Sequence, residues 1–314
     1  MNATIMLALA VGLDLLLGDP AVWPHPVRAI GWCYDRLDAF ADRMGWRSRL
    51  FGTVGVCAVA GGSAVLVWAA SLLPVLGPLC ALYFAYAGLA LGSLLAEARR
   101  AARFLMAGDL DAARTVVGGL VSRETAELDA SQLWRALAES VAENANDGFV
   151  APLFWLALTG PAGLWAYKAV STADSMWGYR TPRHEALGWF GARADDVLAF
   201  VPARLTVAGL WLAARLLGQG RGVTLTAIVR DARKSASPNA GWPMAAAAWL
   251  CGGGMGGPSR YFGRIVEKPR FGPAGGQWDA GRLRLLSRMV LLTGCIVAVG
   301  TIVLRIVFTF CNVA

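Results

Sequence analysis

Long hydrophobic runs dominate the pattern of the chain. Residues 51–96 contain no charged side chain, and these 46 residues are long enough for two membrane spans of about 20 residues each. Pro74, Gly77 and Pro78 lie within this run, where they predict a turn. The pattern therefore predicts a transmembrane helical hairpin over residues 51–96.

Further apolar runs lie on both sides of this hairpin. Residues 5–17 lack the basic start and the cleavage site of a signal peptide, which favours a retained helix. Residues 289–304 form the last clear span. Residues 149–167 fit a span, a re-entrant segment or a buried helix pair, and residues 197–214 are apolar but contain Pro202 and Arg204. The sequence leaves open whether these last two runs cross a membrane.

The composition supports a membrane protein. Hydrophobic side chains make up 56% of the 314 residues and charged side chains only 16%, whereas a soluble domain has about 45–50% and about 25%. We therefore predict an all-α fold, a multi-pass helical integral membrane protein with about 4–6 membrane helices and cytoplasmic helical loops. We expect one polytopic membrane domain over residues 1–314, with a cytoplasmic helical region over residues 97–148.

The charge distribution predicts an orientation. The chain has 29 Lys and Arg against 21 Asp and Glu, a net charge of +8, and only three of the basic residues are lysines. Arginines gather in residues 28–49 and 99–135, on both sides of the hairpin, which predicts that both segments are cytoplasmic. We therefore expect the inner membrane, with the active site facing the cytoplasm. The basic residues form no patch between the apolar runs, so nucleic-acid binding is not expected.

An acidic series in residues 131–148 is the strongest local signal. The segment predicts a helix that begins at Ser131 and stops at Gly148. Glu139, Glu143 and Asp147 recur every four residues, so they lie along one helix face. A solvated acidic face is one interpretation. The other is a Mg²⁺ site, because the helix runs directly into an apolar segment and Mg²⁺ takes carboxylates together with substrate phosphates.

A second polar cluster covers residues 167–180, at the end of an apolar run. Lys168 can neutralise a phosphate, and Asp174 can hold a metal. An interfacial anchor with a polar turn explains the same residues equally well. Both interpretations remain open at this stage.

Two more clusters carry isolated charges. Arg233 and Lys234 precede a turn within residues 231–243; basic residues there can bind an anion or simply mark a cytoplasmic loop. Arg204 lies inside an apolar run and is expected to need a carboxylate partner, with Asp196 as the obvious candidate.

The N-terminal segment also contains polar residues in apolar surroundings. Asp14 interrupts a hydrophobic run, where an ionisable residue is costly and often functional. His25 lies between two prolines and Arg28 follows, although a structural role explains His25 by itself. The chain has no P-loop motif. The glycine-rich residues 252–257 fit either a backbone anion site or close packing.

In this order, the segments resemble those of one family, adenosylcobinamide-phosphate synthase, the CobD/CbiB membrane proteins of cobalamin biosynthesis. The matching stretches are Asp14 to Pro20 with Pro24 to Arg28, Glu139 to Gly148 with Ala151 to Phe154, Tyr167 to Tyr179, Asp195 and Asp196 with Pro202 to Thr206, and Asp231 to Lys234 with Ser237 to Pro243. The resemblance covers residues 11–263. Five motifs in one order argue against a chance match.

The resemblance implies a reaction. The family joins the free propionate carboxyl of adenosylcobyric acid to the amine of aminopropanol phosphate, or of ethanolamine phosphate, and forms adenosylcobinamide phosphate. The step is an amide ligation, which implies ATP as co-substrate, Mg²⁺ as cofactor and a corrinoid as substrate. A lipid bilayer is the expected environment. The resemblance also leaves room for a homo-oligomer or a complex with other enzymes of the cobalamin pathway.

The resemblance also implies roles for the matching residues. Glu139, Glu143, Asp147 and Asp174 are the expected catalytic residues, with Glu139 as the base that takes a proton from the amine. Of these, Glu143, Asp147 and Asp174 are expected to hold Mg²⁺ against phosphate groups. The residues expected to bind substrate are His25, Arg28, Lys168, Tyr179, Arg204, Asp231, Arg233, Lys234 and Asn239.

Three positions depart from the family pattern, and no role is assigned to them. Ser235-Ala236 stands where a histidine is frequent, Met244 where a glutamate is frequent and Ser171 where an asparagine is common.

Two other functions remain open. A membrane sensor of the AmpE type is expected to lose the acidic residues, which this chain retains. A small transporter, with Asp14 and Arg204 along its pathway, is expected to show inverted repeats, and none is evident.

Overall fold

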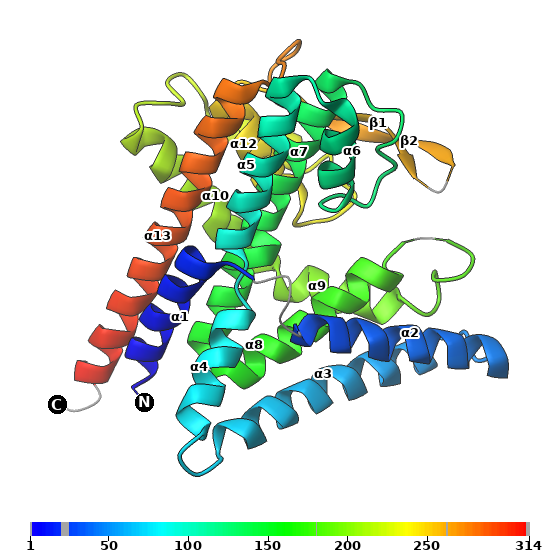
Figure 1. Cartoon of the computed structure of the whole chain (residues 1–314), viewed down its shortest axis with the longest axis vertical. Helices are drawn as coiled ribbons and strands as arrows, with labels where there is room; N and C mark the ends of the chain where they lie inside the picture. Colours follow the sequence, from blue (N-terminus) through cyan, green and yellow to red (C-terminus); the bar gives the residue numbers. More distant parts are fainter. Residues whose placement is uncertain (1, 20–24, 180, 262, 312–314) are drawn as a thin grey trace. The chain divides into compact units, whose positions relative to one another are not determined.

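A computed structural model describes residues 2–19, 25–179, 181–261 and 263–311. Pro20, Pro24 and Arg180, which belong to the sequence motifs, lie outside these ranges. The chain forms two compact units, each built from separate stretches of sequence (Figure 1). The first unit comprises residues 1–90, 151–199 and 298–314, and the second comprises residues 91–150 and 200–297. The expectation of a single polytopic domain stays a prediction.

The first unit is helical. Its helices are α1 (Ala3–Leu17), α2 (Pro26–Met44), α3 (Arg49–Ser71), α4 (Gly77–Ala87), α8 (Ala151–Trp177) and α9 (Trp189–Leu198). Helix α3 packs against both α8 and α9, and α1 packs against α4. The buried hydroxyl of Tyr34 in α2 donates a hydrogen bond to the backbone oxygen of Ala169 in α8, at 2.9 Å. This bond satisfies a polar group inside the apolar interior of the unit.

The second unit combines helices with one β-hairpin. Its elements are α5 (Leu91–Ala107), α6 (Leu110–Gly118), α7 (Ala130–Asn144), a π-helical segment (Ala145–Val150), α10 (Phe200–Leu216), α11 (Leu225–Ala232), α12 (Gly241–Cys251), β1 (Met255–Tyr261), β2 (Arg264–Phe271) and the first part of α13 (Ala280–Cys311). Strands β1 and β2 are antiparallel. The sequence does not predict this hairpin, because its glycine-rich start lacks the alternation of apolar and polar residues that indicates a strand.

Within the described ranges, four helical segments are long and apolar enough to span a membrane: Arg49–Ser71, Gly77–Ala107, Ala130–Trp177 and Ala280–Val307. The pair α9 and α10, bent by 45°, adds a fifth if it forms one span. The chain is therefore a multi-pass helical membrane protein, as the sequence predicts. The first two segments are the predicted hairpin, and the last contains the predicted span 289–304.

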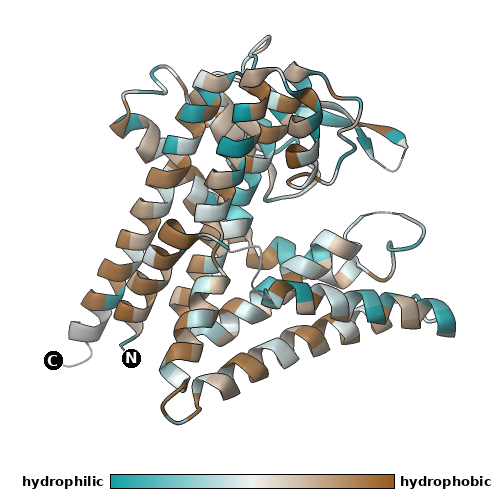
Figure 2. Ribbon diagram, in the orientation of Figure 1, coloured by the Kyte–Doolittle hydropathy of each residue, from teal (hydrophilic) through white to brown (hydrophobic). Residues whose placement is uncertain are grey.

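The exposed apolar side chains fit this assignment. Leu66 and Trp68 on α3 and Val303 and Leu304 on α13 are all more than half exposed. Figure 2 shows hydrophobic residues along α1, α13 and the turn between α3 and α4, and hydrophilic residues on much of α2 and β2. Large exposed apolar surfaces of this kind are costly in water and are satisfied by lipid tails.

One continuous helical segment contains the acidic series. Asp129, and not Ser131, caps α7, and it forms a capping box with Gln132. The helix also does not stop at Gly148, because the π-helical segment carries it directly into α8. Both predicted helix ends are thus wrong. The actual break comes at Gly160, which has φ +72° and precedes Pro161; a positive φ suits glycine and interrupts the helix.

In the first unit, ion pairs connect α2 to Arg183 and His184, which follow α8. Asp38 accepts hydrogen bonds from Arg47 at 2.8 Å and from Arg183 at 2.6 Å, and His184 Nε2 lies 3.6 Å from its carboxylate. Burial opposes the ionisation of Asp38, but the bonds from Arg183 and Arg47 outweigh it and hold its pKa below the usual value. No local sequence pattern predicts this cluster, because Asp38 and Arg183 are 145 residues apart.

Candidate functional site

The residues predicted to form a site divide between the two units. His25, Arg28, Lys168, Asp174 and Tyr179 lie in the first unit, and Glu139, Glu143, Asp147, Arg204, Asp231, Arg233, Lys234 and Asn239 lie in the second. Each group has surroundings of its own. The predicted combination of Asp174 with Glu143 and Asp147 at one metal ion therefore stays a prediction.

His25 begins α2 in the first unit. Its Nδ1 accepts a hydrogen bond from the backbone N–H of Val27 at 3.3 Å, and its Nε2 lies 3.5 Å from the Asp19 carboxylate. The imidazole ring also lies beside the ring of Trp165, with 6.3 Å between the ring centres. The bond from Val27 makes His25 the N-cap of α2. Arg28 follows in the first turn of α2 and is exposed.

The end of α8 carries Lys168 and Asp174. Both side chains are half-buried, and the half-buried Tyr179 follows just beyond the helix. Gly178 donates its backbone N–H to the backbone oxygen of Asp174 at 2.7 Å. A Cβ atom at Gly178 would collide with the Asp174 carboxylate, so the glycine leaves the space that this carboxylate occupies.

Glu139 is held from two sides in the second unit. Its buried carboxylate accepts a charged hydrogen bond from Arg123 at Oε2 and a bond from the Gly256 N–H at Oε1, at 2.6 Å. Arg123 also donates to Ser259 Oγ at 3.2 Å. Burial opposes the charge on Arg123, but Glu139 outweighs this effect and raises the pKa of Arg123. Glu139 thus ties α7 to β1, and its role as a base stays a prediction.

We expect Gly256→Ala to lower the thermal midpoint of unfolding. Gly256 has φ +83°, and a Cβ atom would collide with the backbone oxygen of Pro269. Strain of this kind costs about 1–3 kcal/mol. Gly263→Ala is the matched control, because Gly263 in the same hairpin has φ +74° but open space around it. Equal shifts in the two variants would contradict a close approach of the strands at Gly256.

Glu143 differs from Glu139, although both project from α7. Its side chain is half-buried, and among the described residues no hydrogen bond or ion pair engages its carboxylate. Its electrostatic neighbours are Lys268 of β2, Glu139 and Arg123. A half-buried carboxylate without a hydrogen-bond donor is a candidate to bind a ligand.

Asp147 lies in the π-helical segment and is oriented by its neighbours. Its Oδ1 accepts a hydrogen bond from the Asn146 amide at 2.6 Å, and Asn146 Oδ1 accepts one from Thr206 of α10 at 3.0 Å. The wider π-helical turn changes the spacing on which the predicted alignment with Glu143 depends. Such turns are frequent at functional sites.

Arg204 of α10 binds oxygens that carry no formal charge. Its guanidinium group donates to Asn239 Oδ1 at 2.7 Å and to two backbone oxygens. It also lies over the rings of Phe200 and Trp242, at 3.7 and 4.4 Å from the ring centres. The sequence predicts a carboxylate partner for Arg204, either Asp196 or another acid. Within this unit, Arg204 instead contacts amide and carbonyl oxygens and aromatic ring faces.

Asp231 connects three elements of the second unit. It is 2% exposed, and its Oδ1 accepts a hydrogen bond from Lys234 at 2.6 Å. Its Oδ2 accepts bonds from Trp249 of α12 at 2.8 Å and from the Gly272 N–H, just beyond β2, at 2.9 Å. Burial opposes the ionisation of Asp231, but these bonds outweigh it and hold its pKa below the usual value.

The lowered pKa of Asp231 gives a pH dependence with a defined sign. The stabilisation is complete above the unfolded-state pKa of about 3.9 and is lost as the pH falls through the lower folded-state value. We expect the thermal midpoint of the wild type to decrease when the pH is lowered below about 4. At pH 7, Asp231→Asn should have a lower midpoint than the wild type, because it loses about 1–3 kcal/mol of folding free energy. Thermal scans from pH 3 to pH 7 test this, and an equal acid slope in both proteins would contradict it.

A pocket of about 590 Å³ opens beside Asp231 in the second unit. Its basic lining residues are Arg135, Arg230, Lys234 and Arg270, and glycine-rich backbone from residues 254–256 and 272–276 forms much of the rest. The Nε of Arg135 is buried and, among the described residues, has no hydrogen-bond partner. Several cations, exposed backbone and an unpaired buried donor together fit a phosphate group.

Only part of this pocket is predictable from the sequence. Lys234 and Asp231 belong to a motif, whereas Arg135, Arg230 and Arg270 are missed. The available signal is the glycine-rich run 252–257, for which an anion site is one of the two sequence interpretations. Arg233, predicted together with Lys234, is exposed at the end of α11 and is not a lining residue.

The residues present fit Mg²⁺ only in combination with a substrate. Among the described residues, no group of three or more His, Cys, Asp or Glu side chains is arranged to hold a metal ion. Mg²⁺ is commonly bound by one or two carboxylates together with phosphate oxygens. Glu143 and Asp147 supply suitable oxygen donors within one unit, so these two residues are the better supported of the predicted ligands.

Known proteins identify the family of this chain. Residues 7–290 match the model of the family described as CobD/Cbib protein. Cobalamin biosynthesis protein CobD of Pelobacter propionicus is 40% identical over 299 residues, covering 94% of this chain and 93% of that protein. The protein of the same name from Geobacter metallireducens is 40% identical and covers 95% of this chain and 96% of its own length. The one from Rhodobacter capsulatus is 41% identical and covers 86% of this chain and 87% of its own length. No solved structure shows significant similarity. The chain therefore belongs to the CobD/CbiB family of cobalamin biosynthesis proteins.

Proposed function

We propose that this protein is the ligase that joins the propionate carboxyl of adenosylcobyric acid to the amine of aminopropanol phosphate or ethanolamine phosphate, giving adenosylcobinamide phosphate. Membership of the CobD/CbiB family supports a step on a corrinoid. The structural observation that carries the proposal is the basic pocket beside Asp231. Both ATP and the amine substrate carry phosphate, the group that this pocket is built to bind.

The reaction needs an activated carboxylate. In the proposed sequence, a propionate oxygen attacks the γ-phosphorus of ATP and ADP leaves, which gives an acyl phosphate. The amine nitrogen then attacks the acyl carbon, loses a proton, and phosphate leaves as the C–N bond forms. Negative charge accumulates on phosphoryl oxygens in both steps, so cationic side chains at these oxygens lower the barrier.

The second unit supplies groups for these tasks. Arg135, Arg230, Lys234 and Arg270 bind phosphate oxygens in the pocket. Glu143 and Asp147 hold Mg²⁺, which neutralises phosphate charge when bound. The Asn146 amide, bonded to Asp147 at 2.6 Å, keeps the Asp147 carboxylate in one orientation. The roles predicted for Lys168, Asp174 and Tyr179 of the first unit in binding substrate or metal stay predictions.

The proposed location is the inner membrane, with the site facing the cytoplasm. The arginine-rich segments 28–49 and 99–135 support this orientation, because positive charge is retained on the cytoplasmic side. The second of these segments contributes Arg135 to the pocket. ATP is then available on the side where the pocket opens.

The test uses the purified full chain in detergent. Adenosylcobyric acid, ATP and Mg²⁺ are supplied with aminopropanol phosphate or, in parallel, with ethanolamine phosphate, and the amide is identified by mass spectrometry. We expect ATP-dependent product with at least one of the two amines. A folded protein that neither binds the corrinoid nor makes product with either amine would contradict the ligase and favour a sensor.

A matched pair of variants tests the pocket in the same assay. Arg270 and Arg264 both lie on β2, but only Arg270 lines the pocket. Loss of a charged hydrogen bond costs about 1.5–3 kcal/mol, so Arg270→Gln should raise the KM of a phosphate-bearing substrate roughly tenfold or more. Arg264→Gln should leave KM unchanged, and equal effects would remove the pocket from the mechanism.

A further inference from the structure

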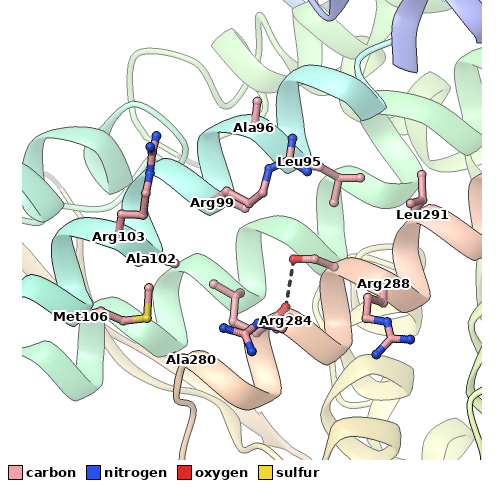
Figure 3. A pocket seen from close by; sticks show the side chains of 13 residues that line it. Leu95, Ala96, Arg99, Ala102, Arg103, Met106, Ala280, Arg284, Arg288 and Leu291 are labelled. Carbon is pink, nitrogen blue, oxygen red and sulfur yellow. Dashed lines mark hydrogen bonds between the residues drawn. The ribbon is translucent and has the colours of Figure 1, made fainter. Parts of the chain in front are cut away.

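A second cavity of the second unit lies outside the proposed site. It is a groove of about 650 Å³ between α5 and the N-terminal part of α13. Figure 3 shows side chains from both helices along it. Its apolar surface comes from small and aliphatic residues of both helices, among them Leu95, Ala98, Ala102, Leu283 and Leu291. No residue of the proposed site lines this groove.

Four arginines flank the groove. Figure 3 shows Arg99 and Arg103 projecting from α5 on one side and Arg284 and Arg288 from α13 on the other. All four are exposed, and among the described residues none forms an ion pair or side-chain hydrogen bond. Their neighbours differ in this respect, because Arg100 pairs with Glu97 and Arg282 with Asp279. The groove thus carries a net positive charge that the chain itself does not neutralise.

The position of these arginines along the helices is equally informative. Helix α5 is the end of the candidate span Gly77–Ala107, and α13 begins the candidate span Ala280–Val307. In both spans, the arginines stand at one end and the apolar residues continue from there. Arginines at the end of a membrane helix lie at the level of the lipid headgroups.

We propose that this groove binds an anionic diacyl phospholipid. The headgroup phosphate lies among Arg99, Arg103, Arg284 and Arg288, and an acyl chain follows the apolar surface past Leu95 and Leu291. Basic pockets between membrane helices bind acidic lipid headgroups in this way. A soluble anion would leave the apolar surface uncovered, and a second protein copy would need acidic residues to match the four arginines.

Native mass spectrometry of the delipidated full chain tests the proposal. The chain is titrated with phosphatidylglycerol, with phosphatidylcholine of the same acyl chains, and with glycerol 3-phosphate as the soluble headgroup. We expect phosphatidylglycerol to bind at least about tenfold more tightly than either of the others. The double variant R99Q/R284Q should lose affinity for it roughly 25-fold, since each surface arginine contributes about fivefold.

Two further variants keep the test specific. R221Q/R264Q removes two exposed arginines outside the groove, and it should bind phosphatidylglycerol as the wild type does. Ala102→Phe keeps every charge but fills the groove, and it should also lose the lipid. Equal binding of phosphatidylcholine, equal binding of glycerol 3-phosphate, or equal losses in R99Q/R284Q and R221Q/R264Q would each overturn the proposal.

Discussion

Replacing Glu143 with glutamine should lower the kcat of amide ligation at least about 100-fold while leaving the thermal midpoint of unfolding unchanged. The reason lies in its surroundings. No described residue forms a hydrogen bond or ion pair with its carboxylate, so the substitution breaks no contact that supports the fold. A ligand of Mg²⁺, in contrast, cannot be replaced by a neutral amide without loss of charge at the ion.

Two measurements make this prediction specific. The Mg²⁺ concentration for half-maximal rate should rise in Glu143→Gln, because a metal ligand has been weakened. Glu185→Gln is the matched control, since Glu185 is an exposed glutamate outside the predicted site, and it should have wild-type kcat and Mg²⁺ dependence. Full activity in a folded Glu143→Gln protein would remove Glu143 from the metal site and from the catalytic residues.

The membrane helices are the part of the fold that the sequence predicts best. The uncharged run 51–96 predicts a hairpin, and α3 and the segment Gly77–Ala107 form it. This success has a physical basis, because lipid requires about 20 consecutive apolar residues whatever the tertiary packing. The ambiguous run 197–214 stays ambiguous for a physical reason as well, since α9 and α10 meet at a bend of 45°.

The errors arise where tertiary contacts override local signals. Gly148 has the helix-ending character that the sequence predicts, but it is buried inside a π-helical segment that continues into α8. The β-hairpin is missed because its strands gain order from distant partners. Gly256 of β1 bonds to Glu139, 117 residues earlier in the chain. Periodicity in a short window contains no information on such contacts.

The sequence predicts the types of residue in the candidate site better than it predicts their arrangement. The four-residue spacing of Glu139, Glu143 and Asp147 suggests one acidic face with one purpose. In the structure, Glu139 is buried against Arg123 and Gly256, Glu143 accepts no hydrogen bond from described residues, and Asp147 lies in the π-helical segment. Spacing places carboxylates on a helix, but their partners are set by loops and strands far away in the sequence.

Arg123→Met should destabilise the protein by about 3–5 kcal/mol, because it leaves the buried Glu139 carboxylate without its counter-charge. The side chains of Arg123 and Glu139 are only 8% and 4% exposed, so water cannot replace the lost partner. The matched control is Arg260→Met, which breaks an ion pair with Glu127 whose side chains are 43% and 77% exposed. An exposed pair of this kind contributes about 0–1 kcal/mol, so the control should shift the thermal midpoint little.

The double variant Glu139→Gln/Arg123→Met separates a structural role of Glu139 from a catalytic one. It leaves no unpaired buried charge at positions 123 and 139, and the glutamine oxygen still accepts the Gly256 N–H, so we expect stability within about 1–2 kcal/mol of the wild type. If Glu139 only ties α7 to β1, ligation activity should return together with stability. If Glu139 is the base that takes the amine proton, the double variant should be stable but inactive. A double variant as unstable as Arg123→Met would contradict the buried ion pair as the origin of the loss.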